Sequence, residues 1–128
     1  FFFICGTLVE DWLFIKLNYF KGISDSKLWI YEVNVKVDRS IEAEYRRLVQ
    51  NHINGITALP GFTGARWLEQ HDNPNPEKEI SWVIHYYAVN YESIENYFNT
   101  LAPTFRAETV AYGSLVNANR RVLKPWNA

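Results

Sequence analysis

Apolar and polar residues alternate over residues 29–37, which read WIYEVNVKV. Aromatic and β-branched residues occupy the odd positions, while Glu32, Asn34 and Lys36 lie between them. A period of two is typical of a β-strand with one buried face. We therefore predict a strand over Trp29–Val37 that buries the face carrying Tyr31.

From residue 41 the apolar positions recur at the spacing of an amphipathic helix. Asp38 and Ser40 precede this stretch and can cap a helix, and Pro60 stops it near Leu59. We therefore predict one long helix between the first and second strands. Its apolar stripe contains Ile41, Tyr45, Leu48, Val49, His52, Ile53 and Ile56.

The second half of the chain repeats the same order of elements. Phe62–Gln70 and Glu79–Val89 read as strands, because they are dense in β-branched and aromatic residues and a polar loop separates them. Asn90 can cap a second helix, which Pro103 splits into two pieces, and Leu115–Leu123 is the last strand. With right-handed crossovers, this order predicts an α+β, ferredoxin-like βαββαβ fold, in which two helices cover one face of a four-stranded antiparallel sheet.

The strand over residues 79–89 is apolar on both faces. Ile80, Trp82, Ile84 and Tyr86 alternate with Val83, Tyr87 and Val89. Two helices cover only one face, so the second face needs a cover of its own. That cover is either the N-terminal segment or a second copy of the chain, and the aromatic residues mixed with Glu32, Asn34 and Arg120 favour a two-fold homodimer.

The first 27 residues differ from the rest in the pattern of their apolar and charged residues. They are rich in aromatic residues, yet Glu10, Asp11 and Lys16 interrupt them, a pattern that fits neither a membrane span nor a secretory signal. The whole chain of 128 residues supports one domain. We therefore predict a domain over residues 28–128, with Leu28 at an alternative start codon, and an N-terminal extension over 1–27 in which Phe1–Ile4 could add a strand.

Composition excludes several classes of protein. The chain has 13 Lys and Arg against 14 Asp and Glu, a balance that argues against nucleic-acid binding. A single cysteine, Cys5, excludes an internal disulfide framework, and no two histidines have the spacing of metal ligands. Glycine-rich phosphate-binding motifs are absent as well. We expect a cytoplasmic protein that uses no metal or other cofactor and binds neither nucleic acid nor membrane.

Several blocks together resemble a known family. They are WIYEVNVKVD over 29–38, LPGFTGARW over 59–67, Ala102-Pro103 with Arg106-Ala107-Glu108, and RRVL over 120–123. These blocks resemble a small domain-of-unknown-function family of the dimeric α+β barrel superfamily, distantly similar to antibiotic-biosynthesis-monooxygenase-type proteins. The resemblance covers residues 28–126 and implies a homodimeric α/β barrel with a small-molecule pocket between helices and sheet. Relatives in the superfamily include cofactor-independent monooxygenases, lactone isomerases and stress-response proteins, so it assigns no single activity.

Five residues are candidates for a site. His52 lies on the apolar stripe of the first helix, where an imidazole can transfer a proton, or can simply bond a backbone carbonyl at the edge of the core. Arg66 can bind an anion through its two-pronged guanidinium group or form a structural ion pair. Tyr31, Trp82 and Tyr86 can line an aromatic pocket or fill the core and interface.

The chain departs from the family pattern at two places. The resemblance implies an acid shortly after His52, where this chain has Asn54 and Gly55, and a histidine before Ala102, where it has Leu101. Both departures argue against a histidine–carboxylate pair and a second base. We expect Arg106 to be solvated or to cap its helix.

Two hypotheses follow. The first is a homodimeric domain that binds a small hydrophobic ligand or serves a structural role. The second is a cofactor-independent monooxygenase or isomerase acting on a small aromatic or lactone-like substrate, with His52 as the proton-transfer group and Arg66 as the anion stabiliser. Free volume beside His52, with Arg66 converging on it, would favour the enzyme.

Overall fold

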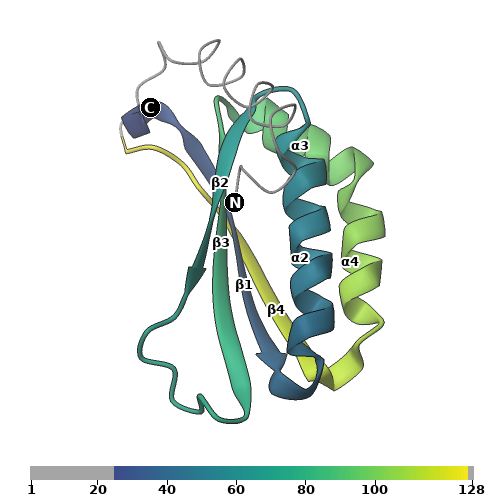
Figure 1. The fold of residues 1–128 in the computed structure, drawn as a ribbon. Coiled ribbons are helices and arrows are strands. Elements are labelled where there is room, and N and C mark those ends of the chain that lie inside the picture. Colours follow the sequence, from purple (N-terminus) through teal and green to yellow (C-terminus); the bar gives the residue numbers. More distant parts are fainter. Residues whose placement is uncertain (1–24, 127–128) are drawn as a thin grey trace, which may run out of the picture.

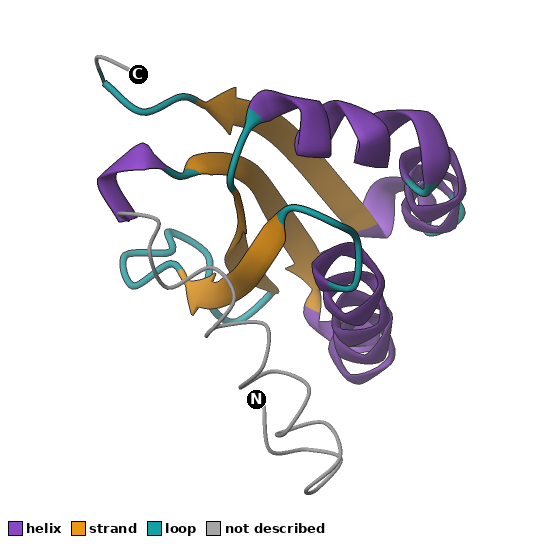
Figure 2. Cartoon of the chain, turned by 90° about the horizontal axis from the view of Figure 1, so that it is seen from above, coloured by secondary structure: helices purple, strands orange, loops and turns teal. Residues whose placement is uncertain are grey.

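A computed structural model describes residues 25–126 of the chain. In this range a twisted sheet carries all of its long helices on one face (Figures 1 and 2). The extension over 1–27, the strand expected at Phe1–Ile4 and Cys5 lie wholly or mostly outside the described residues. The domain boundary therefore stays a prediction.

The sheet has four antiparallel strands in the order β2-β3-β1-β4. They are β1 (Trp29–Asp38), β2 (Phe62–Glu69), β3 (Glu79–Ala88) and β4 (Val116–Leu123). Each strand end lies within one residue of its predicted position. Helices follow β1 and β3 in the chain, so the predicted ferredoxin-like α+β topology is confirmed.

Helix α2 (Glu42–Thr57) follows β1. The Asp38 carboxylate accepts a hydrogen bond from the Ser40 amide at 2.9 Å and caps the short turn that leads into α2. After α2 the chain turns through Gly61, whose φ of +87° favours glycine. A Cβ atom there would lie 1.9 Å from the Ser93 hydroxyl oxygen, so a larger residue has no room at this turn.

The second helical segment is split in two, as predicted. Helix α3 (Tyr91–Thr100) begins where the Asn90 side chain accepts a hydrogen bond from the Ser93 amide at 3.0 Å. Leu101 alone separates α3 from helix α4 (Ala102–Val110), which has Pro103 in its first turn. The helix layer therefore consists of α2 and of the two pieces, α3 and α4, into which the second predicted helix is divided.

The hydrophobic core lies between the sheet and the helix layer. On β1 and β3 the alternate residues that include Tyr31 and Tyr86 are buried against the helices, as the period-two pattern predicts. The opposite face of β3 presents Val83, His85 and Tyr87, which are half-buried. The largest fully buried side chains are Tyr31, Tyr45, Ile53, Ile56, Phe62, Ile84 and Ile94.

Candidate functional site

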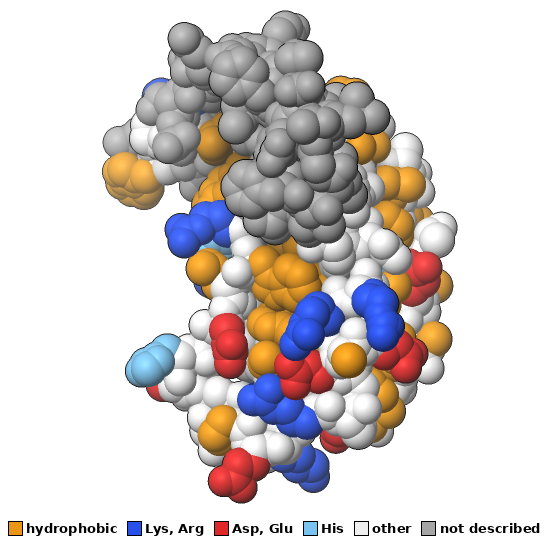
Figure 3. Space-filling model, viewed as in Figure 1, with side chains coloured by type: hydrophobic (Ala, Val, Ile, Leu, Met, Phe, Trp, Pro, Cys, Tyr) orange, Lys and Arg blue, Asp and Glu red, His pale blue; other side chains and the backbone are white. Residues whose placement is uncertain are grey.

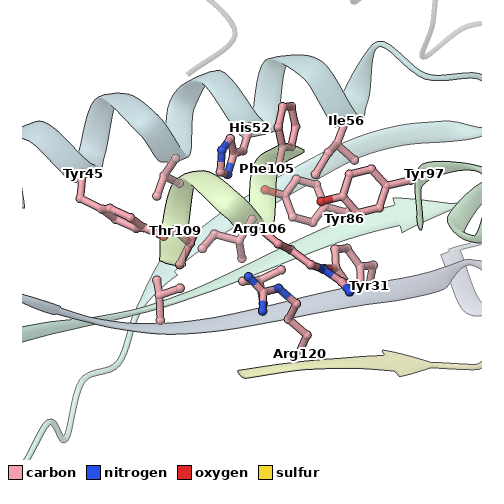
Figure 4. A pocket seen from close by; sticks show the side chains of 14 residues that line it. Tyr31, Tyr45, His52, Ile56, Tyr86, Tyr97, Phe105, Arg106, Thr109 and Arg120 are labelled. Carbon is pink, nitrogen blue, oxygen red and sulfur yellow. Dashed lines mark hydrogen bonds between the residues drawn. The ribbon is translucent and has the colours of Figure 1, made fainter. Parts of the chain in front are cut away.

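A small cavity lies between α2 and α4 on one side and β1, β3 and β4 on the other (Figure 4). Its free space is about 30 Å³, roughly the volume of one water molecule in the liquid. Aliphatic side chains form part of its wall: Val33, Val35, Val49, Ile56 and Ile84. The remaining lining residues are aromatic or polar: Tyr31, Tyr45, His52, Tyr86, Tyr97, Phe105, Arg106, Thr109 and Arg120.

His52 lines this cavity from α2, on the helix face that the sequence pattern assigned to it. Its side chain is 14% exposed, and its Nε2 atom lies 2.9 Å from Oε1 of Glu108 on α4. The Phe105 ring stacks on the imidazole, with ring centroids 4.2 Å apart and planes 8° apart. The sequence pattern does not predict this carboxylate, because Glu108 is 56 residues from His52 in the chain. The carboxylate comes from α4, which packs beside α2.

Burial controls the charge of His52. Removal from water lowers the pKa of the imidazole below its usual 6.5, and the Glu108 carboxylate partly offsets this effect. The nearby Arg120 guanidinium lowers the pKa further. The ring is therefore neutral at pH 7. Because a carboxylate oxygen only accepts hydrogen bonds, the Nε2 atom of His52 carries the proton and Nδ1 is left as an acceptor.

Tyrosine rings form the floor of the cavity. The predicted ligand contacts Tyr31 and Tyr86 both line it, and their rings lie 5.8 Å apart in a stacked arrangement. Tyr97 lies 5.4 Å from the Tyr31 ring. Burial raises the pKa of Tyr86 and Tyr97 well above the usual 10. These phenols stay protonated and can donate hydrogen bonds to a bound group.

Two residues that were predicted to lie elsewhere, Arg106 and Arg120, reach the cavity. Arg106 was expected to be solvated or to cap α4; it is half-buried, and its Nη2 atom lies 3.4 Å from the Tyr31 hydroxyl. Arg120 was expected on the open face of the sheet, which is the face opposite the helices and carries Val83, His85 and Tyr87 of β3. It pairs with Val33 across β1 and β4, which places it on the helix side, where it lines the cavity. Strict alternation along β4, counted from the buried Val116, would have found Arg120.

Arg66 does not join His52. It lies opposite His85 in the β2–β3 ladder, whereas its neighbours Ala65 and Trp67 lie opposite Tyr86 and Ile84 on the helix side. Arg66 is therefore on the open face of the sheet, and the sheet separates it from His52. The predicted convergence of the two residues on one substrate is wrong.

Trp82 also lies outside the cavity. It packs edge-on against Trp67, with ring centroids 5.1 Å apart, in a surface groove of about 450 Å³ between β2 and the start of α2. Arg39, Glu42 and Arg46 border this groove. Figure 3, in the same view as Figure 1, shows apolar side chains at the centre of the molecule with acidic and basic groups on either side.

The open face of the sheet carries a charged network. Glu32 is 6% exposed and accepts hydrogen bonds from Arg121 Nε at 2.6 Å, Asn34 Nδ2 at 2.8 Å and His85 Nε2 at 2.8 Å. These contacts, that of Arg121 foremost, lower the pKa of Glu32 from 4.5 to about 2. A buried carboxylate thus anchors β1 to both of its neighbouring strands.

Within residues 25–126, no group of three or more His, Cys, Asp or Glu side chains is placed to hold a metal ion. None of the helices in this range is long and apolar enough to cross a membrane. The side chains that line the cavity can transfer a proton, donate hydrogen bonds and bind an anion.

The order of the elements and the placement of the cavity between sheet and helices define an α+β domain of the ferredoxin-like type. The chain belongs to the family called domain of unknown function DUF4286, whose model matches residues 28–126. No functionally curated protein matches the sequence.

Solved structures share the fold at low sequence identity. SnoaB, a cofactor-independent oxygenase from Streptomyces nogalater, superposes with a TM-score of 0.56 at 17% identity, over 79% of this chain and 96% of SnoaB. Rv0793 from Mycobacterium tuberculosis gives 0.57 at 15% identity, over 78% and 97%. A putative antibiotic biosynthesis monooxygenase from Bacillus cereus gives 0.51 at 14% identity, over 80% and 96%. Identities this low establish the fold alone.

Proposed function

We propose that this domain is a homodimeric, cytoplasmic small-molecule-binding protein whose ligand occupies the cavity between α2, α4 and the sheet. One observation carries the proposal: a titratable imidazole and buried phenol groups line one apolar cavity. His52, Tyr31, Tyr86 and Tyr97 are among its polar members. Concave sites with mostly apolar walls and a few convergent polar groups are the usual form of ligand pockets.

The free space of about 30 Å³ is smaller than any aromatic ring, so a ligand has to displace side chains. Rotamer changes of this kind are common on binding. Arg106 and Arg120 are half-buried and have long, flexible side chains, so they are the groups best able to move aside. A ligand would then take the volume that these two side chains leave, with their guanidinium groups still at its edge.

NMR tests the location of the site. Methyl and aromatic resonances of the protein are recorded during titration with a panel of small aromatic compounds and lactones. We expect the His52 ring and the Tyr31 and Tyr86 rings to shift, while His71 in the β2–β3 loop stays unchanged. Shifts confined to His85 on the open face, or no shifts with any compound, would contradict the proposed site.

A second candidate function is cofactor-independent catalysis, and the His52–Glu108 contact supports it. In this scheme Nδ1 of His52 takes a proton from an acidic C–H or O–H group of the substrate and leaves an enolate or phenolate. Glu108, bonded to Nε2 at 2.9 Å, then stabilises the imidazolium ion. SnoaB, which shares the fold, is a cofactor-independent oxygenase.

Turnover assays with the same compound panel test catalysis. Oxygen uptake and lactone ring opening are measured for the wild type, His52→Gln and His71→Gln, the last being an exposed control in the loop. General base catalysis contributes roughly 10²–10⁴-fold, so His52→Gln should lose at least about a hundredfold in kcat, whereas His71→Gln keeps its rate. Equal turnover by all three proteins would remove His52 from the reaction.

The open sheet face supports the homodimer. Next to the buried Glu32 network it presents Tyr87 between Ile30 and Gly64 in the strand ladders. An apolar strip beside satisfied polar groups fits the composition of a dimer interface. Sedimentation of Tyr87→Glu should show a monomer, whereas Arg47→Glu on the exposed side of α2 stays dimeric. A monomeric wild type at micromolar concentration would contradict the dimer.

A further inference from the structure

The cavity has an unusual balance of charge. None of its 14 lining residues is an acid, yet two of them are arginines. Figure 4 shows Arg106 extending from α4 and Arg120 from β4 into the same part of the cavity. Glu108 is the acid in contact with a lining residue, and its Oε1 atom bonds His52. Within residues 25–126, neither arginine forms an ion pair.

Arg106 has donors that the described residues leave unused. Its Nη2 atom makes only a long contact of 3.4 Å with the Tyr31 hydroxyl, and its guanidinium group lies 5.2 Å from the centroid of the Phe98 ring. Its Nε atom is buried and has no hydrogen-bond acceptor among the described residues. A guanidinium group offers five N–H donors, and a buried donor without an acceptor costs free energy. The missing partner is therefore an acceptor, and a negative one fits best.

Arg120 contrasts with the next residue in the chain. Arg121 points to the open face, where its Nε atom bonds the Glu32 carboxylate at 2.6 Å. Arg120 points to the helix side, where it lines the cavity and forms no ion pair with an acid of residues 25–126. Its charge also acts on cavity groups: burial raises the pKa of Tyr45 and lowers that of His52, and the Arg120 guanidinium group adds a smaller lowering to each. Arg121 thus has a carboxylate partner, whereas Arg120 has none in the part of the chain that the structure describes.

We propose that the cavity binds a small aromatic carboxylate, with Arg106 and Arg120 holding the anion. This inference rests on the proposed function, because it names the chemical class of ligand for that same cavity. The carboxylate supplies an acceptor for the buried Nε atom of Arg106 and a counter-charge for Arg120. The ring lies among Phe105, Tyr86 and Tyr97, whose faces and edges suit an aromatic ligand. Arginine forks bind carboxylates through two parallel hydrogen bonds, which gives affinity and orientation.

Calorimetry with a matched pair of probes tests the proposal. Benzoate and benzamide have nearly the same shape, but only benzoate is charged. We expect the wild type to bind benzoate more tightly than benzamide. Arg106→Gln and Arg120→Gln should each weaken benzoate binding by about tenfold or more, the loss typical of one charged hydrogen bond. Neither substitution should change the affinity for benzamide, and Arg47→Gln, an exposed control on α2, should change nothing.

A lysine variant distinguishes the loss of the anion contact from the loss of the folded structure. Arg106→Lys keeps the charge but loses the fork, so benzoate affinity should lie between those of the wild type and Arg106→Gln. Equal affinity for both probes, unchanged by either arginine variant, would overturn the anion site while leaving the ligand cavity in place. If neither probe binds or shifts the His52 resonance, both the anion site and the proposed cavity function are contradicted.

Discussion

His52 and Glu108 are 56 residues apart in the chain, yet their Nε2 and Oε1 atoms lie 2.9 Å apart where α2 packs on α4. The contact joins a neutral, largely buried imidazole to a carboxylate that is 46% exposed. Phe105, one turn before Glu108 on α4, stacks on the same imidazole. Helix packing, rather than any local motif, therefore brings this imidazole and this carboxylate together.

Removing the carboxylate should change the titration of His52. Burial lowers the pKa of His52 and Glu108 raises it, so Glu108→Gln should lower this pKa further below 6.5. Titration of the Cε1 proton by NMR measures the shift, with the His71 resonance as an internal reference. Glu95→Gln, which removes an exposed acid from α3, should leave the His52 curve unchanged. A higher His52 pKa in Glu108→Gln would show that the contact does not act as described.

Glu32 should make folding sensitive to acid. Its pKa is about 2 in the folded chain against 4.5 as the ordinary value, so the folded state binds fewer protons between these two pH values. The stabilisation is fully present above pH 4.5 and is lost as the pH falls towards 2. Glu32→Gln should therefore lower stability by about 2 kcal/mol at pH 7 and flatten the loss between pH 5 and pH 3, roughly the window of this titration.

Urea unfolding at pH 7, 5 and 3, at one fixed protein concentration, measures this effect. Glu77→Gln in the exposed β2–β3 loop is the matched control and should follow the wild type at every pH. If Glu32→Gln also loses stability in parallel with the wild type on acidification, the acid sensitivity comes from other groups.

Gly55 lets α4 approach α2 beside His52. A Cβ atom at this position would lie 2.8 Å from Cζ of Phe105, so Gly55→Ala has to push the Phe105 ring away. Alanine favours a helix by about 1 kcal/mol over glycine, whereas overpacking costs about 1–3 kcal/mol. We expect a net loss of about 1 kcal/mol and a clear change in the His52 ring resonances, because its stacking partner moves.

Thermal or urea unfolding of Gly55→Ala gives the free energy, and NMR gives the ring shifts. Asn54→Ala, one residue earlier and exposed on the same helix, is the control and should be neutral or slightly stabilising. Stabilisation by Gly55→Ala with an unchanged His52 spectrum would mean that Phe105 does not need the space beside Gly55.

The elements of the fold could be predicted because local signals agree with one another. Alternation marks Trp29–Val37, Pro103 marks the break between α3 and α4, and Asn90 marks a helix start; the structure has all three features. His52, Tyr31 and Tyr86 were also placed correctly beside the core, since periodicity determines which face a residue occupies.

The partners within the site could not be predicted in this way. Glu108 reaches His52 only because α4 packs on α2, and periodicity within one helix does not encode that contact. Arg66 was grouped with His52 because of its chemistry, although its position relative to Ala65 and Trp67 places it on the other face. The pairing register between strands decides which side chains share a face of the sheet, and the sequence of one chain does not give that register.

The cavity between α2, α4 and the sheet is the proposed ligand site. Crystals of the domain soaked with a panel of small aromatic acids and their neutral amides test it directly. We predict density for an aromatic ring between Phe105 and Tyr86, with the acid group against Arg106 or Arg120. If the compounds occupy only the groove at Trp67 and Trp82 or the open sheet face, while the cavity holds no more than water, the claim is contradicted.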